Sequence, residues 1–557
     1  MSNLREDFRQ SIAEGLLSQT LTSCSRWAMH RRIMGEPFPG PYGFKYHPWC
    51  REPHDAASSY VTIMKAAQMG LTEVAINRAF FMVDVLKKGA LYVLPTMLNA
   101  SDFSKARFGN ALMYSEHLNG LFTDTNTVGL KQAGGVSLYI RGSRGDSNLK
   151  GIPVSALILD ELDEMDQGQV FLALERLSGH IEKSVFALST PTVPMFGIHK
   201  LYRQGSQEHF YFKCPHCGNR TELVWPDCVE IRGESISDKE VKESFLKCKE
   251  CGHRLEHEDK PELFKNAKWE ATVDADDNRS FYINQLYSYT VTPGELVQAH
   301  FRGMGDEAAN VEFHNSKLGN PYIPDGGQVT DEEIDNVVSR AYTKDSPRPM
   351  VGRERLITMG VDQGKSNHIV VAEYFIEGSP GYDINAVAFK KILYEAERPG
   401  TDWGELDLLM REWQVLACVV DADPNVNDAR RFARRFPGYC WLCRYRRGLS
   451  GREMNISEED GGAPMATVDR TSWLDATMSR FHSEAPRISL PADTSFQFKN
   501  HIGNMVRTFE RDENNNARAT YLTVGGHDHF AHALCYSEIA LPLAGAITTG
   551  QNIKKFL

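Results

Sequence analysis

Short apolar runs alternate with longer amphipathic stretches between about residues 45 and 200. The runs have the length and apolar character of buried strands, and the stretches between them have helical spacing. Alternation of this kind predicts a parallel sheet whose strands are connected by crossover helices. The predicted strands are SYVTIMK (59–65), GALYVLP (89–95), VSLYIRG (136–142), VSALILD (154–160) and SVFALS (184–189).

A second strand-rich pattern begins near residue 355 and includes RLITMGVDQG, HIVVAEYF, AVAFKKILY and LACVVDAD. Between the two patterns, residues 205–270 contain cysteine pairs, and residues 320–350 are polar and turn-rich, as at a domain boundary. The pattern ends in a predicted helix, DHFAHALCYSEIA. We therefore predict two α/β domains and two terminal segments: a domain at 45–340 with an insertion at about 205–270, a domain at 350–545, and segments 1–44 and 546–557.

Composition agrees with more than one domain, because 557 residues are too many for a single hydrophobic core. The formal charge of −11 shows no global basic character, so any contact with nucleic acid must come from local patches. No membrane span and no secretory signal are expected, because no long apolar run occurs and the N-terminus lacks a basic start followed by an apolar core. The 11 cysteines are odd in number and scattered, which favours a reducing, cytosolic setting.

The segment KAAQMGLT (65–72) follows the first predicted strand and resembles a phosphate-binding loop. Gly70 and Thr72 occupy the positions of the second glycine and the hydroxyl. Leu71 stands where the usual pattern has lysine, and Lys65 stands at the first glycine. A helix beginning near Gly70 would direct backbone N–H groups at phosphates, and Lys65 could reach them from the other side of the loop. The alternative is a strand-to-helix turn capped by Thr72.

Two further strand ends contribute to this prediction. VSALILDELDEMD places Asp160 and Glu161 at the carboxyl end of a buried strand, where ligands bind in open α/β sheets. Asp160 would hold Mg²⁺ and Glu161 would polarise the attacking water. The following acids, Asp163 among them, are equally compatible with an acidic surface loop. FALSTPT ends another strand in hydroxyls, including Thr190, that could sense hydrolysis beside the γ-phosphate.

Two C-x-x-C pairs, each followed by glycine, have the spacing of a tetrahedral zinc ribbon. All four positions are cysteine, so no coordination position remains open and the zinc is expected to be structural. A third pair, Cys440 and Cys443, has no glycine turn and is expected to be buried thiols. The predicted zinc ligands are Cys214, Cys217, Cys248 and Cys251.

The second domain carries three acids at predicted element ends: Asp362 and Asp421 on strands, and Asp528 at the start of the last helix. Carboxylates that converge in this way can hold two divalent ions, Mg²⁺ or Mn²⁺, for phosphodiester cleavage. Asp423 is a candidate additional ligand, and His532 lies on the same helix face as Asp528. A nearby basic stretch could contact phosphates, or could be a solvated helix face; it contains Arg430, Arg431, Arg434, Arg435, Arg444, Arg446 and Arg447.

The displaced lysine, the LILDELDE strand and the STPT strand end together resemble the large terminase subunits of tailed double-stranded-DNA phages, in the lambda-like branch. That branch likewise has its lysine at the N-terminal end of the loop and carries a zinc insertion. The resemblance implies phosphate and Mg²⁺ contacts for the loop, coupling of hydrolysis to DNA movement for Ser189–Thr192, and a trans-acting arginine, Arg141 or Arg144. It implies an α/β fold: a RecA/ASCE-like phosphate-loop ATPase with a zinc-ribbon insertion and a C-terminal ribonuclease H-like nuclease.

The implied function is an ATP-driven motor that moves double-stranded DNA into a procapsid and cuts concatemeric DNA with a two-metal endonuclease. The resemblance implies a small terminase subunit, the portal protein and the procapsid as partners, a homo-oligomeric ring on the portal, and the host cytoplasm as location. Segments 1–44 and 546–557 would be docking segments. Two alternatives remain at this point: a helicase-like ATPase of a restriction or repair system, and a non-catalytic zinc-containing DNA-binding protein.

Overall fold

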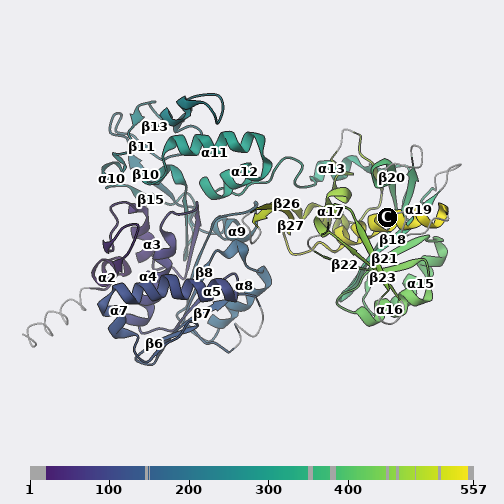
Figure 1. Cartoon of the computed structure of the whole chain (residues 1–557), viewed down its shortest axis with the longest axis horizontal. Coiled ribbons are helices and arrows are strands. Elements are labelled where there is room, and N and C mark those ends of the chain that lie inside the picture. The colour runs from purple at the N-terminus through teal and green to yellow at the C-terminus, as the bar shows by residue number, and fades with distance from the viewer. Residues whose placement is uncertain are drawn as a thin grey trace, which may run out of the picture. The chain divides into compact units, whose positions relative to one another are not determined.

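The chain forms two compact units, Met1–Tyr322 (unit 1) and Ile323–Leu557 (unit 2), drawn in purple to teal and in teal to yellow in Figure 1. Each unit is described separately below. The structure is a computed structural model, and it describes residues 21–144, 149, 151–348, 355–376, 384–446, 449, 451–458, 463–482, 485–511 and 516–549.

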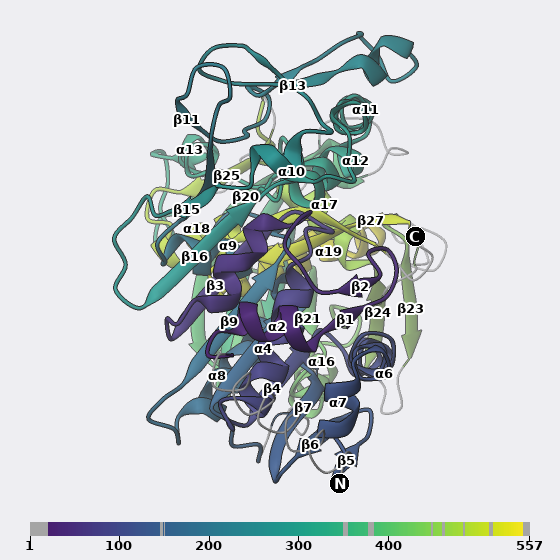
Figure 2. The same ribbon diagram turned by 90° about the vertical axis from the view of Figure 1, so that its left-hand side faces the viewer.

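Unit 1 is built on an eight-stranded sheet, several strands of which can be followed in Figure 2. The strands from β16 to β7 are parallel, and β6 and β5 extend the sheet antiparallel. All five strands predicted from the apolar runs are present, and the parallel sheet is confirmed. In spatial order the strands are β16 (Asn278–Ile283), β3 (Tyr60–Lys65), β9 (Ser184–Ser189), β8 (Ala156–Asp160), β4 (Ala90–Leu94), β7 (Val136–Gly142), β6 (Leu130–Ala133) and β5 (Thr125–Asn126).

Apolar side chains cover both faces of this sheet, which explains why its strands read as continuous apolar runs. One core includes Ile63 of β3 and the buried side of helix α4 (Leu71–Asp84). The other includes Leu157 of β8 and packs against α8 (Gln167–Leu174) and α9 (Gly197–Arg203). Further helices before the insertion are α3 (Arg51–Asp55), α5 (Met97–Phe103), α6 (Asn110–Tyr114) and α7 (Glu116–Leu121).

The sequence predicted a separate N-terminal segment at residues 1–44. Residues 21–44 instead belong to unit 1 and contribute side chains to its core. Helix α2 (Cys24–Arg31) packs on α4, and β1 (Ile33–Met34) pairs with β2 (Gly40–Pro41). Trp27 is fully buried, and its Nε1–H donates to Oδ2 of Asp84 at 2.8 Å. The indole thus finds its partner at the far end of α4, which the local sequence does not reveal. Residues 1–20 of the predicted docking segment lie outside the described residues.

The insertion at about 205–270 forms two three-stranded sheets, ordered β11-β10-β15 and β12-β13-β14. Beyond it, the chain returns to the main sheet at β16 and ends unit 1 with helices α11 (Pro293–Gly305) and α12 (Glu307–Glu312). The elements of the insertion are β10 (His209–Lys213), β11 (Arg220–Thr221), β12 (Val229–Glu230), β13 (Phe245–Lys247), β14 (Arg254–Leu255), α10 (Lys260–Leu263) and β15 (Lys268–Glu270).

Unit 2 is built on a nine-stranded mixed sheet. Its centre is an antiparallel meander of β18, β19 and β20, from which β21, β22 and β24 continue parallel to β18. In spatial order the strands are β17 (Val338–Ser339), β25 (Ile488–Pro491), β20 (Ala388–Pro399), β19 (Ser366–Ile376), β18 (Leu356–Asp362), β21 (Ala417–Asp421), β22 (Cys440–Tyr445), β24 (Pro464–Val468) and β23 (Met454–Glu458). Cys440 and Cys443 on β22 are fully buried, which confirms that this pair is not a surface knuckle.

Helices cover both faces of the second sheet (Figure 1). The long helix α19 (His529–Thr549) crosses β18 so closely that a β-carbon at Gly360 would lie 2.0 Å from the Ala533 carbonyl oxygen. α19 is long and apolar enough to meet a length-and-composition test for a membrane span, but 89% of the tested window is buried inside the protein, as expected for a core helix. The remaining elements are α13 (Asp331–Asn336), α14 (Ile384–Val387), α15 (Trp403–Glu412), α16 (Val426–Arg435), α17 (Arg470–Met478), α18 (Phe496–Gly503), and the hairpin β26 (Met505–Arg511) and β27 (Ala517–Thr523).

The boundary between the units falls after Tyr322, inside the polar region 320–350 but ahead of the predicted domain limits at 340 and 350. The polar stretch that suggested a later boundary contains α13 and β17, and both belong to unit 2. β17 pairs with β25, so Val338 finds its partner at Leu490, about 150 residues later in the chain. At the other end, α19 continues to Thr549, so the first residues of the predicted tail 546–557 are helical, and residues 550–557 lie outside the described residues.

Candidate active sites

The candidate phosphate loop connects the end of β3 at Lys65 to the start of α4 at Leu71. Gly70 is the N-cap residue, with a left-handed φ of 78°, and a β-carbon there would lie 2.9 Å from Cδ2 of His47, so conformation and space both favour glycine. Among the residues that the structure describes, no side chain caps the N-terminus of α4, so Thr72 does not cap this turn as the alternative supposed. The first-turn N–H groups of a helix have no intrahelical acceptor, and this end of α4 can therefore bind an anion.

Contacts from other parts of unit 1 fix the path of this loop. The N–H of Ala66 donates to the carbonyl oxygen of Ile283, the last residue of β16, at 2.8 Å. Trp49 is buried, and its Nε1–H donates to the carbonyl oxygen of Met69 at 2.8 Å. The loop is therefore held in shape by the protein itself, as a preorganised binding site requires.

Lys65 and the acidic end of β8 meet at the carboxyl edge of the sheet. Nζ of Lys65 lies 3.0 Å from Oε1 of Glu161. Asp160 is buried, and its Oδ2 accepts a hydrogen bond from the Tyr92 hydroxyl at 2.6 Å, whereas Oδ1 has no hydrogen-bond partner among the described residues. Burial, reinforced by the neighbouring Glu161, raises the pKa of Asp160. One oxygen of Asp160 is thus held and the other is available, which suits a metal ligand.

Asp163 links the acidic strand end to the hydroxyl-rich turn after β9, and it is not part of an acidic surface loop. Its side chain is buried, and Oδ2 accepts hydrogen bonds from the N–H and the hydroxyl of Thr192 at 2.8 and 2.9 Å. Oδ1 accepts from the N–H of Ile198 at 2.6 Å, and the N–H of Asp163 donates to the Ser189 hydroxyl at 3.2 Å. Burial raises the pKa of Asp163 to about 7. Thr190 therefore lies in a turn that Asp163 holds on both sides.

The two candidate arginine fingers differ in their surroundings. Nη1 of Arg141 donates to the carbonyl oxygen of Ile140 at 2.9 Å and also bonds to the carbonyl of Gly129, and its guanidinium lies over the Tyr139 ring. Arg144 is exposed, beyond the carboxyl end of β7. Arg141 therefore bonds to carbonyl groups of its own unit, and Arg144 occupies the more exposed position of the two.

The four cysteines predicted to bind zinc come together, and the Sγ atoms of Cys214, Cys217, Cys248 and Cys251 all lie within 4.8 Å of one another. Both knuckles turn at glycines with left-handed φ, 71° at Gly218 and 69° at Gly252. The N–H groups of these glycines donate to the carbonyl oxygens of Cys214 and Cys248 at 2.9 and 2.8 Å. Four thiols at this separation are compatible with a closed tetrahedral zinc site.

In unit 2, the ends of two adjacent parallel strands bring two of the predicted acids together. Val361 pairs with Val420, so Asp362 and Asp421 follow at the same edge of the sheet. Burial, and then the charge of Asp362, raises the pKa of Asp421 to about 6. Asp423 is exposed instead, and its Oδ2 is 3.1 Å from Nε of Arg444.

Asp528 precedes α19 and lies in a separate hydrogen-bond arrangement. Its Oδ2 accepts from the Thr523 hydroxyl at 2.7 Å and is 3.5 Å from Nε2 of His532. The bonds to His532 and Thr523 outweigh the effect of burial and lower the pKa of Asp528. His532 also offsets part of the rise in the pKa of Asp421, so it lies within electrostatic reach of both acids.

Two histidines that the sequence did not single out as ligands lie beside Asp362. His368 faces Asp362 across the antiparallel β18–β19 pair, and Nδ1 of His529 is 2.9 Å from Oδ2 of Asp362. The side chain of His529 is 46% exposed and also contacts the first acid. The hairpin spacing between Asp362 and His368 is the sequence signal that could have indicated this pairing.

The predicted basic stretch lies mainly on helix α16, where Arg431, Arg434 and Arg435 are exposed on one side and Phe432 is buried on the other. Oδ1 of Asp407 is 2.8 Å from Nε of Arg435, and Asp428 pairs with Arg431. Exposed pairs of this kind contribute little stability, so the arginines can exchange these partners for phosphates. Arg447 lies outside the described residues.

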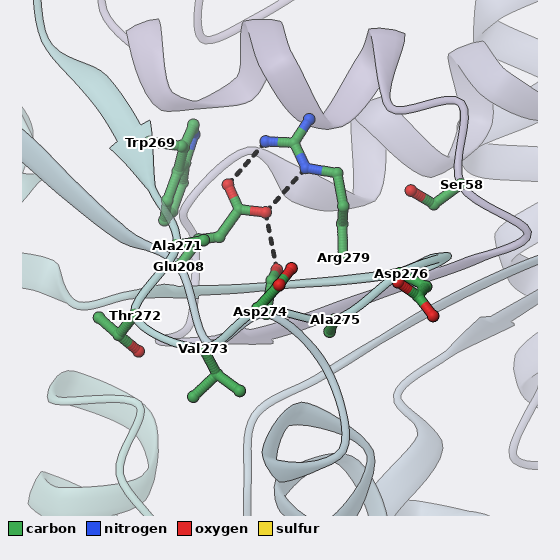
Figure 3. Close-up of a pocket in the computed structure, with 11 residues that line it drawn as sticks. Ser58, Glu208, Trp269, Ala271, Thr272, Val273, Asp274, Ala275, Asp276 and Arg279 are labelled. Atoms are coloured by element: carbon green, nitrogen blue, oxygen red, sulfur yellow. Dashed lines mark hydrogen bonds and ion pairs between the residues drawn. The ribbon is translucent and has the colours of Figure 1, made fainter.

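A cavity of about 590 Å³ at the other edge of the unit 1 sheet is not the candidate nucleotide site. Figure 3 shows Glu208 and Arg279 facing each other in it, with Nε and Nη2 of Arg279 at 2.7 and 2.6 Å from the two carboxylate oxygens. Arg279 pairs with Val61 near the start of β3, whereas Lys65 at the end of β3 pairs with Ile283. The carboxylate of Glu208 and the guanidinium of Arg279 therefore pair with each other in this cavity, away from the phosphate loop.

The fold and the clustered side chains define a two-domain α/β protein: a phosphate-loop NTPase fold followed by a ribonuclease H-like nuclease fold. Residues 36–269 match the family model described as the ATPase domain of the phage terminase large subunit gpA, and residues 278–432 match the one described as its endonuclease domain. Together these matches cover more than half of the chain. The chain belongs to the large terminase subunits of the gpA type, the lambda-like branch.

Individual relatives are distant. The large terminase subunits of Escherichia phage lambda and Enterobacteria phage P21 are each 22% identical to this chain, over 340 and 344 residues, or 54% and 55% of it. In both cases the chain spans about half (52%) of the relative's own length. Among solved structures, the HK97 bacteriophage large terminase matches 93% of this chain and 98% of its own, at 10% identity and a TM-score of 0.45.

Proposed function

We propose that this chain is the motor subunit of a viral DNA-packaging machine, which hydrolyses ATP to move double-stranded DNA into a procapsid and cuts concatemeric DNA with its second unit. The observation that carries the proposal is the contact between Lys65 and Glu161, 3.0 Å apart at the carboxyl edge of the unit 1 sheet. It supports the role of the displaced lysine as the phosphate-loop lysine, because it brings that side chain to the acidic strand end, where the γ-phosphate would react.

In the ATPase unit, each named group has a separate task. The N-terminus of α4, with Gly70 and Thr72, would hold the phosphates, and Lys65 would neutralise their charge. Asp160, through its free Oδ1, would hold Mg²⁺, which when bound supplies charge neutralisation and orientation of the phosphates. Glu161 would leave Lys65 and accept the proton of the attacking water.

The turn Ser189–Thr192 would transmit the result of hydrolysis. Asp163 joins this turn to the strand that carries Glu161, and the carbonyl oxygen of Thr192 accepts a hydrogen bond from the N–H of Tyr322 at 3.0 Å. Tyr322 is the last residue of unit 1. A shift of the acidic strand end would therefore reach the end of the unit through two hydrogen-bonded steps.

In the nuclease unit, Asp362, Asp421 and Asp528 would hold divalent ions, Mg²⁺ or Mn²⁺, which when bound supply activation of water and stabilisation of the leaving oxygen. Burial, and then the charge of Asp362, raises the pKa of Asp421, and a bound cation would relieve the repulsion between the two carboxylates. The exposed arginines of α16 would contact the DNA backbone.

The partners proposed from the family are double-stranded DNA, a small terminase subunit, the portal protein and the procapsid. The chain would act in the host cytoplasm as a homo-oligomeric ring on the portal. In such a ring Arg144 of one subunit would reach the nucleotide of the next, since Arg141 is bonded to carbonyl groups of its own unit.

A packaging assay tests this proposal. Purified chain, its cognate small subunit and empty procapsids are mixed with linear DNA and ATP, and the DNA protected from added nuclease is measured. We expect ATP-dependent protection with the wild-type chain and none with Glu161→Gln. ATP hydrolysis without any protected DNA, under conditions in which a related phage's complete system packages, would favour the helicase-like alternative.

We also propose that the four-cysteine cluster holds a structural Zn²⁺. We expect about one zinc ion per chain by atomic absorption, and we expect Cys248→Ser to lose this zinc and to lower the melting temperature of unit 1, because structural zinc stabilises small folds by several kcal/mol or more. Cys228→Ala is the matched control: Cys228 lies in the same insertion, but its thiol donates to the Glu222 carbonyl and is not in the cluster. Equal zinc content in both variants would contradict the assignment.

A further inference from the structure

The first acid of the nuclease unit lies in a cluster that includes nitrogen ligands. Asp362 ends β18, His368 stands opposite it on β19, and His529 is the first residue of α19. One potential ligand atom from each of the three residues lies within 4.8 Å of the others. The β18–β19 hairpin and the distant helix α19 thus bring one carboxylate and two imidazoles to the same point at the edge of the sheet.

His368 has surroundings typical of a metal-binding histidine. Its side chain is only 5% exposed, and Nδ1 is buried with no hydrogen-bond partner among the described residues. Nε2 lies 3.8 Å from Oε1 of Glu397, so a carboxylate faces the other side of the ring, as it does for many metal-bound histidines. A buried nitrogen without a partner is unfavourable in a folded protein, and a bound ligand would relieve this.

His529 completes the arrangement and leaves a route to solvent. Its ring stacks on that of His368, with centroids 4.6 Å apart and an interplanar angle of 16°. Because the side chain of His529 is 46% exposed, an ion can approach the cluster from water.

We propose that Asp362, His368 and His529 bind one divalent transition-metal ion through a carboxylate oxygen and two imidazole nitrogens. The inference deepens the nuclease assignment and rests on it for what the ion does, whereas binding itself rests only on the cluster. Nitrogen ligands favour Mn²⁺, Co²⁺ or Zn²⁺ over Mg²⁺, which prefers oxygen. Asp421 and Asp528 are carboxylates, so the site would combine a nitrogen-containing position with an oxygen-rich one.

Mn²⁺ bound to the zinc-loaded full-length chain tests this inference, because thiolates of the zinc cluster do not favour Mn²⁺. The Mn²⁺ affinity is measured by electron paramagnetic resonance, and directly bound nitrogen is detected by pulsed measurements on the same samples. We expect ¹⁴N coupling in the wild type, and in His529→Ala a weaker coupling and an affinity lower by about ten-fold or more. His527→Ala is the matched control, since His527 lies two residues away and contributes no ligand atom to the cluster. We expect it to behave as the wild type.

The outcomes separate this inference from the nuclease assignment. Mn²⁺ bound without ¹⁴N coupling, or coupling and affinity unchanged in His529→Ala, would overturn the nitrogen site even if the chain cuts DNA. Nitrogen-bound Mn²⁺ in a chain that cuts no DNA with any divalent ion would support the site and overturn the nuclease. His529→Asn serves as a second variant, because it retains a polar side chain at this half-exposed position should His529→Ala fold poorly.

Discussion

Replacing Glu161 with glutamine is expected to lower DNA-stimulated ATP hydrolysis by about 100- to 10,000-fold, the contribution of a well-placed general base. Glutamine keeps the size of the side chain and its ability to contact Lys65, but it cannot accept the proton of the attacking water. Nucleotide binding should therefore persist, and the loss should appear in kcat and not in KM. Steady-state phosphate release with saturating DNA measures it.

The matched control for this experiment is Glu175→Gln. Glu175 is an exposed acid at the end of α8, where the cap bonds use only its backbone, so its replacement should leave hydrolysis unchanged. If Glu161→Gln hydrolyses ATP at the rate of this control, the acid at the end of β8 is not the base. The contact between Lys65 and Glu161 would then be an ion pair at the edge of the sheet without a catalytic role.

Replacing Asp362 or Asp421 with asparagine is expected to reduce metal-dependent cleavage of plasmid DNA by about 1,000-fold, which corresponds to about 4 kcal/mol of transition-state stabilisation. Each change keeps the shape of the side chain but removes a negative charge from the strand edge where the ions would bind. The measurement is the rate of supercoiled plasmid loss with Mg²⁺ and with Mn²⁺. ATP hydrolysis by unit 1 should be unaffected.

Asp423→Asn is the matched control for the nuclease. Asp423 lies two residues after Asp421, but its carboxylate is exposed and pairs with Arg444. We therefore expect cleavage close to that of the wild type, although the sequence alone made Asp423 a candidate ligand. Equal losses in all three variants would indicate that the acidic loop acts through DNA binding or folding and not through metal ligation.

The features that the sequence predicted correctly are those whose partners are local or follow from strand order. Parallel strands place their carboxyl ends at one edge, so Lys65, Asp160 and Ser189 could be brought together from their positions at strand ends alone. Likewise, the two glycine knuckles set the direction of the cysteine thiols within a few residues. In both cases the residues that carry the chemistry can be recognised from short sequence motifs.

Most of the features that were missed depend on pairing between distant parts of the chain. His368 meets Asp362 across the β18–β19 hairpin, whose spacing could have indicated the pair, but His529 reaches Asp362 only because α19 crosses the sheet over Gly360. The role of Asp163 depends on the turn after β9, which lies about 30 residues further along the chain. A single sequence without these contacts cannot distinguish such residues from surface acids and histidines.

The most direct test of the account is to measure ATP hydrolysis and plasmid cleavage side by side in Glu161→Gln and Asp362→Asn. The account predicts a crossed result: Glu161→Gln loses hydrolysis and keeps cleavage, and Asp362→Asn loses cleavage and keeps hydrolysis. That outcome would establish two independent active sites, one in each unit. Full activity of both kinds in both variants would contradict the assignment of both sites, because hydrolysis and cleavage would then depend on other residues.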